Sequence, residues 1–180
     1  MRINHQLITE LDIENYLKKY NMKITNKYVF FWNGIYSQWY EAPMTIDGVR
    51  YRCCEQYMMH QKALFFGDTE TAEKIMLTSH PNDQKQLGRQ VKDFDKNRWD
   101  KVNLQIVYKG NLAKFTQNED LKKELLETGN RILVEASPYD QIWGIGMGEE
   151  EPGIDDAINW KGQNLLGWAI QLVKQELQNQ

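Results

Sequence analysis

Apolar residues recur at helical spacing over most of the chain after residue 53. The periodic stretches are about 54–66, 69–78, a short one from 82 or 83, 95–115, 119–128 and 164 to the C-terminal region. Gly67 and Gly129 follow two of them, where glycine suits a left-handed helix end. Asp95 and Asn118 precede two others as candidate N-caps. The pattern predicts a mainly helical domain whose 95–115 stretch is one long helix.

Short β-patterns lie on both sides of the first helices. Residues 28–32 read Tyr-Val-Phe-Phe-Trp, residues 44–51 alternate around Asp47-Gly48 as a hairpin does, and residues 131–135 read Arg-Ile-Leu-Val-Glu. We expect an α+β fold in which a single, mainly helical domain of residues 27–180 carries a small antiparallel sheet. Apolar spacing within residues 7–20 predicts an accessory N-terminal helix, so residues 1–26 are set apart from that domain.

The segment 136–162 is rich in glycine and acidic residues and lies between the last strand and the last helix. It exceeds the length at which structureless loops are usual in a compact domain, which indicates a functional segment. Trp143 is its one large apolar anchor among several glycines. Two interpretations stay open: the segment closes over bound ligand with Trp143 as its lid residue, or Trp143 anchors the segment in the core.

Charge and cysteine content narrow the function classes. The formal net charge is −3, from 22 Lys and Arg against 25 Asp and Glu, so no broad basic surface is expected for nucleic-acid backbones. The sequence contains no stretch of about 18 apolar residues, so no membrane-spanning helix is expected. Cys53 and Cys54 are the only cysteines, and they have no partner cluster at metal spacing. We therefore expect a cytoplasmic protein with reduced thiols, no metal site and no cofactor.

One helix carries the strongest chemical signal. Glu55 and Lys62 lie seven residues apart, close to two turns, so they share a stripe with Met58 and Met59. Alternation of charge with methionine suits neither a simple core nor a simple solvated face. The stripe is typical of a pocket wall.

Several ordered blocks along the chain carry a family resemblance. They are Phe31-Trp32 before Ser37-Gln38-Trp39; Glu55-Gln56-Tyr57 with Gln61-Lys62-Ala63 and Phe66-Gly67-Asp68; Leu87-Gly88-Arg89; Trp99; Lys114-Phe115-Thr116-Gln117-Asn118; Thr128-Gly129; Leu133-Val134-Glu135; Asp140 with Trp143-Gly144-Ile145-Gly146; and Gly162-Gln163-Asn164-Leu165-Leu166-Gly167. In order and spacing these blocks, from about residue 28 to residue 174, resemble the NADAR (YbiA-like) N-glycosidases. The resemblance implies a YbiA-like fold and an enzyme that cleaves N-glycosidic bonds of ribosides.

The chemistry of that reaction assigns roles to three residues. Breaking a ribosyl C–N bond builds positive charge on the sugar, so a carboxylate near C1, here Glu55, stabilises the transition state or positions water. The departing base needs a proton, and Asp140 is the candidate donor. Lys62 either clamps a phosphate or, as the resemblance allows, captures an opened ribose aldehyde as a Schiff base, and both roles stay open.

Seven further residues are expected to bind substrate. Arg89 reads as a phosphate fork, or alternatively as an ion-pair partner of Asp93 or Asp95. Asn164 starts a helix whose free amides suit an anion. Phe31 and Trp32 are aromatic residues of an expected ligand entrance. The remaining three belong to one block: Trp143, Gly144 and Gly146.

The resemblance implies that the substrate is a phosphorylated riboside, and we place ADP-ribose on guanine ahead of a riboflavin-pathway ribosylamino-pyrimidine phosphate. Some relatives have an aspartate between the glycines of the Trp-Gly-x-Gly block, and this chain has Ile145 there, which we interpret as favouring a larger ligand. ADP-ribosylated ends or loops of nucleic acid are a further class of partner. A module that binds ADP-ribose without turnover is the alternative of another class, and the sequence makes no prediction of oligomeric state.

Overall fold

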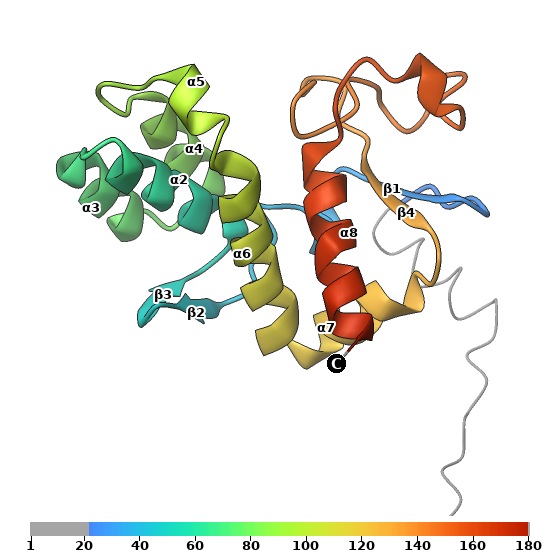
Figure 1. Ribbon diagram of the computed structural model, residues 1–180, viewed down its shortest axis with the longest axis horizontal. Helices are drawn as coiled ribbons and strands as arrows, with labels where there is room; N and C mark the ends of the chain where they lie inside the picture. The colour runs from blue at the N-terminus through green and yellow to red at the C-terminus, as the bar shows by residue number, and fades with distance from the viewer. Residues whose placement is uncertain (1–21, 180) are drawn as a thin grey trace, which may run out of the picture.

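The computed structural model describes residues 22–179, and Figure 1 shows their arrangement. The elements in chain order are β1 (Tyr28–Phe31), η1 (Gly34–Tyr36), β2 (Met44–Ile46), β3 (Val49–Tyr51), α2 (Cys54–Phe65), α3 (Thr69–Leu77), α4 (Pro81–Arg89), α5 (Lys96–Trp99), α6 (Asn103–Gln117), α7 (Glu119–Glu127), β4 (Ile132–Glu135), η2 (Ala157–Asn159) and α8 (Leu165–Gln178). The α+β, mainly helical class predicted from the sequence is confirmed.

The strands form two separate pairs, which corrects the expected single antiparallel sheet. β2 and β3 make the predicted antiparallel hairpin, with Met44 opposite Tyr51. β1 instead pairs in parallel with β4, in a register that sets Phe31 beside Glu135. The order of the strands along the chain suggested a single meander. The continuous apolar run of β1 is instead typical of a parallel strand, which is buried on both faces.

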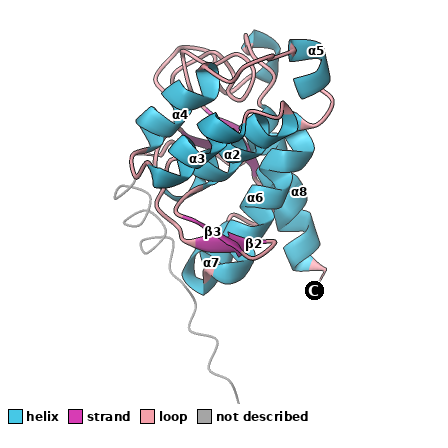
Figure 2. Cartoon of the chain, turned by 90° about the vertical axis from the view of Figure 1, so that its left-hand side faces the viewer, coloured by secondary structure: helices cyan, strands magenta, loops and turns pink. Residues whose placement is uncertain are grey.

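The helices form the body of the molecule around one main hydrophobic core. α6 and α8 pack together at its centre, α8 covers β4, and α2 contacts α3, α4 and α6 (Figure 1). The hairpin β2–β3 contacts α6 through β2 and α2 through β3, and the perpendicular view shows it below the α2–α3 helices (Figure 2). The main core includes Phe31, Phe115, Leu133 and Ile170, each fully buried.

Helix ends follow the predicted signals with two exceptions. Gly67 has φ +75° just after α2, and Asp95 Oδ1 accepts a hydrogen bond from Arg98 N at the start of α5. The expected long helix over 95–115 is wrong, because the chain makes a turn at residues 100–102 and so divides it into α5 and α6. Neither glycine nor proline marks that turn, which is why the sequence did not reveal it.

The predicted N-cap Asn118 is the second exception. It occupies the N-cap position of α7 but its side chain accepts no cap hydrogen bond. Its Nδ2 donates to Lys114 O (2.8 Å) near the end of α6 and to Pro43 O (3.2 Å) just before β2. The residue therefore joins α6 to the chain before β2.

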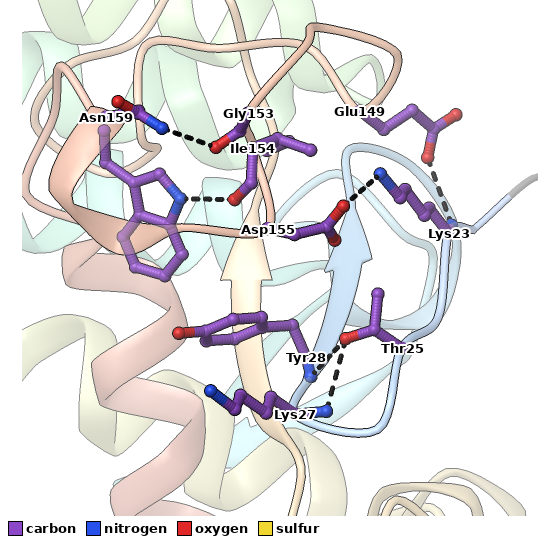
Figure 3. Close-up of polar contacts among 10 residues, drawn as sticks. Lys23, Thr25, Lys27, Tyr28, Glu149, Gly153, Ile154, Asp155 and Asn159 are labelled. Atoms are coloured by element: carbon purple, nitrogen blue, oxygen red, sulfur yellow. Dashed lines mark hydrogen bonds and ion pairs between the residues drawn. The ribbon is translucent and has the colours of Figure 1, made fainter.

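The segment 136–162 is a packed part of the fold. Ile145, Met147 and Ile154 are buried and form a second small core with Phe30 and Val134. Trp160 Nε1 donates to Ile154 O (2.8 Å). Asn159 Nδ2 donates to Gly153 O (2.9 Å), as Figure 3 shows. These contacts are not those of a segment hinged as a whole, so the expected closure of all of 136–162 finds no support.

The N-terminal side of the described chain also holds this segment. Lys23 Nζ pairs with Asp155 (3.0 Å), and Lys23 N donates to Glu149 Oε2 (3.3 Å), as Figure 3 shows. The accessory helix expected within residues 7–20 lies outside the described residues. Between residues 22 and 179, no helix is long and apolar enough to cross a membrane.

Candidate active site

A pocket of about 670 Å³ lies between the α2–α4–α5 group and the chain that follows β1 and β4. Of the predicted site residues it is lined by Trp32, Glu55, Lys62, Arg89, Asp140 and Trp143. Its volume falls within the usual range for small-molecule sites. The predicted pocket wall on α2 is confirmed as a lining surface, since Met58 and Met59 also border the pocket.

Glu55 lies in the first turn of α2, and only 5% of its surface is exposed. Its backbone N–H donates to Gln38 O (2.9 Å), which fixes the start of the helix against the chain after β1. Burial raises the pKa of Glu55 to about 7, with Asp140 adding to the rise, while Lys85, the Trp39 side chain and Arg89 oppose it. A carboxyl group poised near neutral pH is typical of catalytic acids and bases.

Lys62 reaches the same pocket from two turns further along α2. Its Nζ donates to Gly88 O (2.7 Å) and lies 4.1 Å from the centroid of the Phe94 ring. Burial lowers the pKa of the Lys62 amine, and the neighbouring Arg89 lowers it further, whereas Glu55 raises it. A lysine in such surroundings is closer to its neutral, nucleophilic form than one in water.

Close packing of α4 on α2 positions the cationic side of the pocket. A Cβ on Gly88 would lie 2.0 Å from the Met59 sulfur, so a larger residue here would force the Met59 side chain to move. The close packing brings Gly88 O to Lys62 and sets Arg89 at the pocket lining. Within residues 22–179, Arg89 forms no ion pair with Asp93 or Asp95, so that alternative is wrong.

Buried polar groups of α6 hold the turn that forms another wall. Lys114 is fully buried, and its Nζ donates to Ser37 O (2.9 Å). Asn111 Nδ2 donates to Gln38 Oε1 (2.9 Å). Gln38 and Trp39 both line the pocket. The family-like block at residues 114–118 therefore serves the site from behind, because it fixes a turn rather than touching the ligand space.

Asp140 and Trp143 belong to one tight turn. Asp140 Oδ1 accepts hydrogen bonds from Ile142 N (2.9 Å) and Trp143 N (2.8 Å). The Trp143 carbonyl in turn accepts from Leu166 N (3.1 Å) near the start of α8. Trp143 is half-buried, packs against the main core and also lines the pocket. Both interpretations of this ring thus find contacts that support them.

The lining residues that sequence reasoning did not select include Glu135, Lys85 and Tyr139. Glu135 ends β4, and burial raises its pKa to about 8, with Asp140 and Glu55 adding to the rise and Lys85 opposing it. The available signal was an acidic residue that ends an otherwise apolar strand. Lys85 and Tyr139 gave no comparable signal. Lys85 lines the pocket because of how α4 packs, and Tyr139 because of how the loop after β4 packs.

Four residues expected to bind substrate have structural roles and do not line the pocket. Phe31 is fully buried in the main core, because it points opposite to its neighbour Trp32. Asn164 Nδ2 donates to Leu133 O (3.0 Å) and its Oδ1 accepts from Glu135 N (2.9 Å), so its side chain is committed to β4. The other two are the glycines at 144 and 146.

The two glycines allow the chain after β4 to fold back closely against the end of that strand. A Cβ on Gly144 would lie 2.9 Å from Asp140 O and 3.0 Å from Glu135 O, and Gly146 has φ +65°. Ile145 between them is fully buried in the second core. Its side chain does not reach the ligand space, so the argument from Ile145 to a larger ligand is wrong.

Exposed aromatic side chains form the rim of the pocket. The Trp32 and Tyr139 ring centroids lie 5.8 Å apart. Trp32 follows β1, and Tyr139 belongs to the loop after β4. Tyr139 is 85% exposed and Trp32 47%. On the opposite side Lys85 Nζ lies 5.8 Å from the Trp39 ring centroid. Flat, exposed rings beside cations suit a planar, anionic ligand.

The donor set within residues 22–179 contains no group of three or more His, Cys, Asp or Glu side chains arranged to hold a metal ion. Cys53 and Cys54 are free and buried, and burial raises the pKa of Cys54 to about 12. Neither thiol is in a setting that favours the reactive thiolate.

Comparison with known proteins agrees with this geometry. The NADAR domain family matches residues 30–178. N-glycosidase R617 of Acanthamoeba polyphaga mimivirus is 43% identical over 167 residues, covering 86% of this chain and 98% of that relative. N-glycosidase YbiA of Escherichia coli (strain K12) is 29% identical over 144 residues, covering 80% and 81%. The NMR structure of E. coli YbiA matches with a TM-score of 0.71 at 26% identity, over 87% of this chain and 88% of that one. The chain therefore belongs to the NADAR domain family, together with the YbiA-like N-glycosidases.

Proposed function

We propose that the protein hydrolyses the N-glycosidic bond of a phosphorylated riboside, and that its substrate is guanine carrying ADP-ribose. One observation carries the proposal: a buried carboxyl group, Glu55, and a partly desolvated amine, Lys62, line the same pocket as two further cations, Lys85 and Arg89. N-glycosidase names among the relatives support the reaction class.

Glu55 is the proposed electrostatic and water-positioning group. The ribosyl cation that develops as the C1′–N bond breaks is stabilised by a carboxylate, and the effect is large where water is excluded. With a pKa of about 7 the group is available in both forms near neutral pH, so it can accept the proton of the attacking water.

Lys62 has two proposed roles, and its surroundings are compatible with each. As an ammonium group it would bind a phosphate or the ribose hydroxyl groups close to Arg89. As a neutral amine it would attack C1′ of an opened ribose and form a Schiff base. Its lowered pKa supports the second role, and its hydrogen bond to Gly88 O fixes the amine for either.

ADP-ribose on guanine is preferred because of the rim. A diphosphate with a second nucleobase would use cations along one wall and exposed rings at the mouth, and Lys85, Trp32 and Tyr139 supply both. The alternative substrate is a ribosylamino-pyrimidine phosphate, which the compact inner group of Lys62 and Arg89 would suit through its single phosphate. ADP-ribosylated ends or loops of nucleic acid are a further class of substrate, whose bases these exposed rings would also suit.

The test is incubation of the protein with ADP-ribosylated guanosine and, separately, with the ribosylamino-pyrimidine phosphate, followed by chromatography of the released base. We expect guanine-containing product to form faster in the first reaction. Base release only from the second would assign the alternative substrate. Tight binding of ADP-ribose with no base release from either would refute the enzyme and favour a binding module.

A further inference from the structure

Two carboxyl groups besides Glu55 act electrostatically on the pocket, and their bonding differs. Asp140 Oδ1 accepts two backbone N–H groups and so holds the turn that carries Trp143. An oxygen engaged in this way serves as an acceptor, and its position is set by the turn. Asp140 is therefore better suited to position the loop than to deliver a proton.

Glu135 has the opposite character. Its backbone is fixed on both sides, since its N–H donates to Asn164 Oδ1 (2.9 Å) and its carbonyl accepts from Ile145 N (3.0 Å). Its Oε2 is buried and has no hydrogen-bond partner among residues 22–179. A rigid strand end thus presents a buried carboxyl oxygen with an unused hydrogen-bonding position at the pocket lining. Unpartnered buried polar groups call for an explanation, and a catalytic role is one.

Charged groups from three elements act on Glu135. Asp140 in the following turn and Glu55 on α2 raise its pKa, Lys85 on α4 lowers it, and burial is the largest cause of its rise to about 8. The pKa of Glu55 is about 7. Two interacting carboxyl groups in one pocket lose their protons in separate steps, so one group of the pair can be ionised and act as a base while the other is protonated and acts as an acid.

We propose that Glu135 is the general acid of this site and that Asp140 is a positioning residue, an inference that rests on the N-glycosidase function proposed above. As the C1′–N bond breaks, its electron pair moves to the base nitrogen, which takes the Glu135 proton. Water then adds to C1′ and gives its proton to the Glu55 carboxylate. The products are the free base and the ribose hydroxyl, and transfer of one proton from Glu55 to Glu135 through solvent restores the enzyme.

The test is the pH dependence of kcat/KM on whichever of the two ribosides the wild-type protein cleaves. We expect the wild-type rate to fall above about pH 8, because ionised Glu135 cannot donate a proton. Glu135→Gln should lower kcat by about a hundredfold or more and abolish this alkaline decline. Asp140→Asn should keep the decline but move it to lower pH, and Lys85→Met should move it to higher pH.

The matched control is Glu124→Gln. Glu124 also has a buried Oε2 without a hydrogen-bond partner and a raised pKa of about 7, but it lies on α7 and does not line the pocket. This variant should leave kcat and the alkaline decline unchanged. An unchanged decline in Glu135→Gln, or a kcat above half the wild-type value, would overturn the assignment while leaving the function intact. Absence of base release by the wild-type protein would instead refute the function itself.

Discussion

Ionisation of Glu135 should destabilise the folded protein, and Glu135→Gln should remove that effect. In the folded state the pKa of this carboxyl is raised from 4.5 to about 8, mainly by burial. A raised carboxyl pKa means that the stability present below about pH 4.5 is lost as pH rises towards the folded pKa. The difference between 4.5 and about 8 corresponds to about 5 kcal/mol, because a tenfold change in an equilibrium constant is worth ~1.4 kcal/mol.

Glu135 as a whole is only partly buried, so solvent screens part of its charge and we expect about half of this value, ~2–3 kcal/mol, between about pH 5 and pH 9. For a chain of this size that is a difference of roughly 4–12 °C in melting temperature. The assay is thermal unfolding of wild type and Glu135→Gln at both pH values. The variant should gain stability relative to wild type at high pH and gain little at low pH.

A pH-independent effect of the substitution cancels in this comparison, since only the change in the Tm difference counts. Glu73→Gln, at an exposed position on α3, serves as the control and should show the same Tm difference from wild type at both pH values. Equal Tm differences for Glu135→Gln at about pH 5 and pH 9 would refute the buried, pKa-shifted carboxyl. The proposed acid role would then lose its electrostatic support.

Four further outcomes are expected. Glu55→Gln should keep the fold and lower turnover by about a hundredfold, and near-normal turnover would remove Glu55 from the mechanism. Borohydride should trap a substrate adduct on the wild-type protein but not on Lys62→Ala if Lys62 forms a Schiff base, whereas no adduct on either protein assigns it to the clamp. Trp143→Ala should weaken ligand binding by about 1–3 kcal/mol and also lower the melting temperature, and a lower melting temperature with unchanged affinity would reject its ligand contact. Lys114→Met should fold but lower kcat, because Ser37 O loses its donor and the turn bearing Gln38 and Trp39 loosens; wild-type kinetics would contradict that positioning role.

Local signals accounted for most of the secondary structure. The end of α2 at Gly67 and the start of α5 at Asp95 were predictable because each depends on a residue and its immediate neighbours. The division between α5 and α6 was not, because no turn-forming glycine or proline marks it. Helical spacing alone continues across such a turn, so sequence periodicity overestimates helix length there.

The site was predictable where its residues share one helix. Glu55 and Lys62 belong to a single stripe of α2, so helix geometry was enough to bring them together. Residues on other elements were harder to assign. Asn164 carries a polar side chain in a family-like block, but long-range bonds to β4 use its donor and acceptor. Glu135 showed the reverse, since its importance depends on burial that only the assembled fold creates.

The parallel pairing of β1 with β4 explains why the two sides of the pocket meet. Phe31 and Glu135 stand in register, and Ala136 N donates to Phe31 O (2.7 Å), so the chain leaves both strands at the same end. The segments that follow, about 32–39 and 136–143, therefore run out together toward α2 and α4 and contribute Trp32 and Tyr139 to one rim. An antiparallel pair would send the two segments to opposite ends of the strands. The strand orientation that the sequence did not predict is thus the feature that lets Glu135 reach the pocket occupied by Glu55.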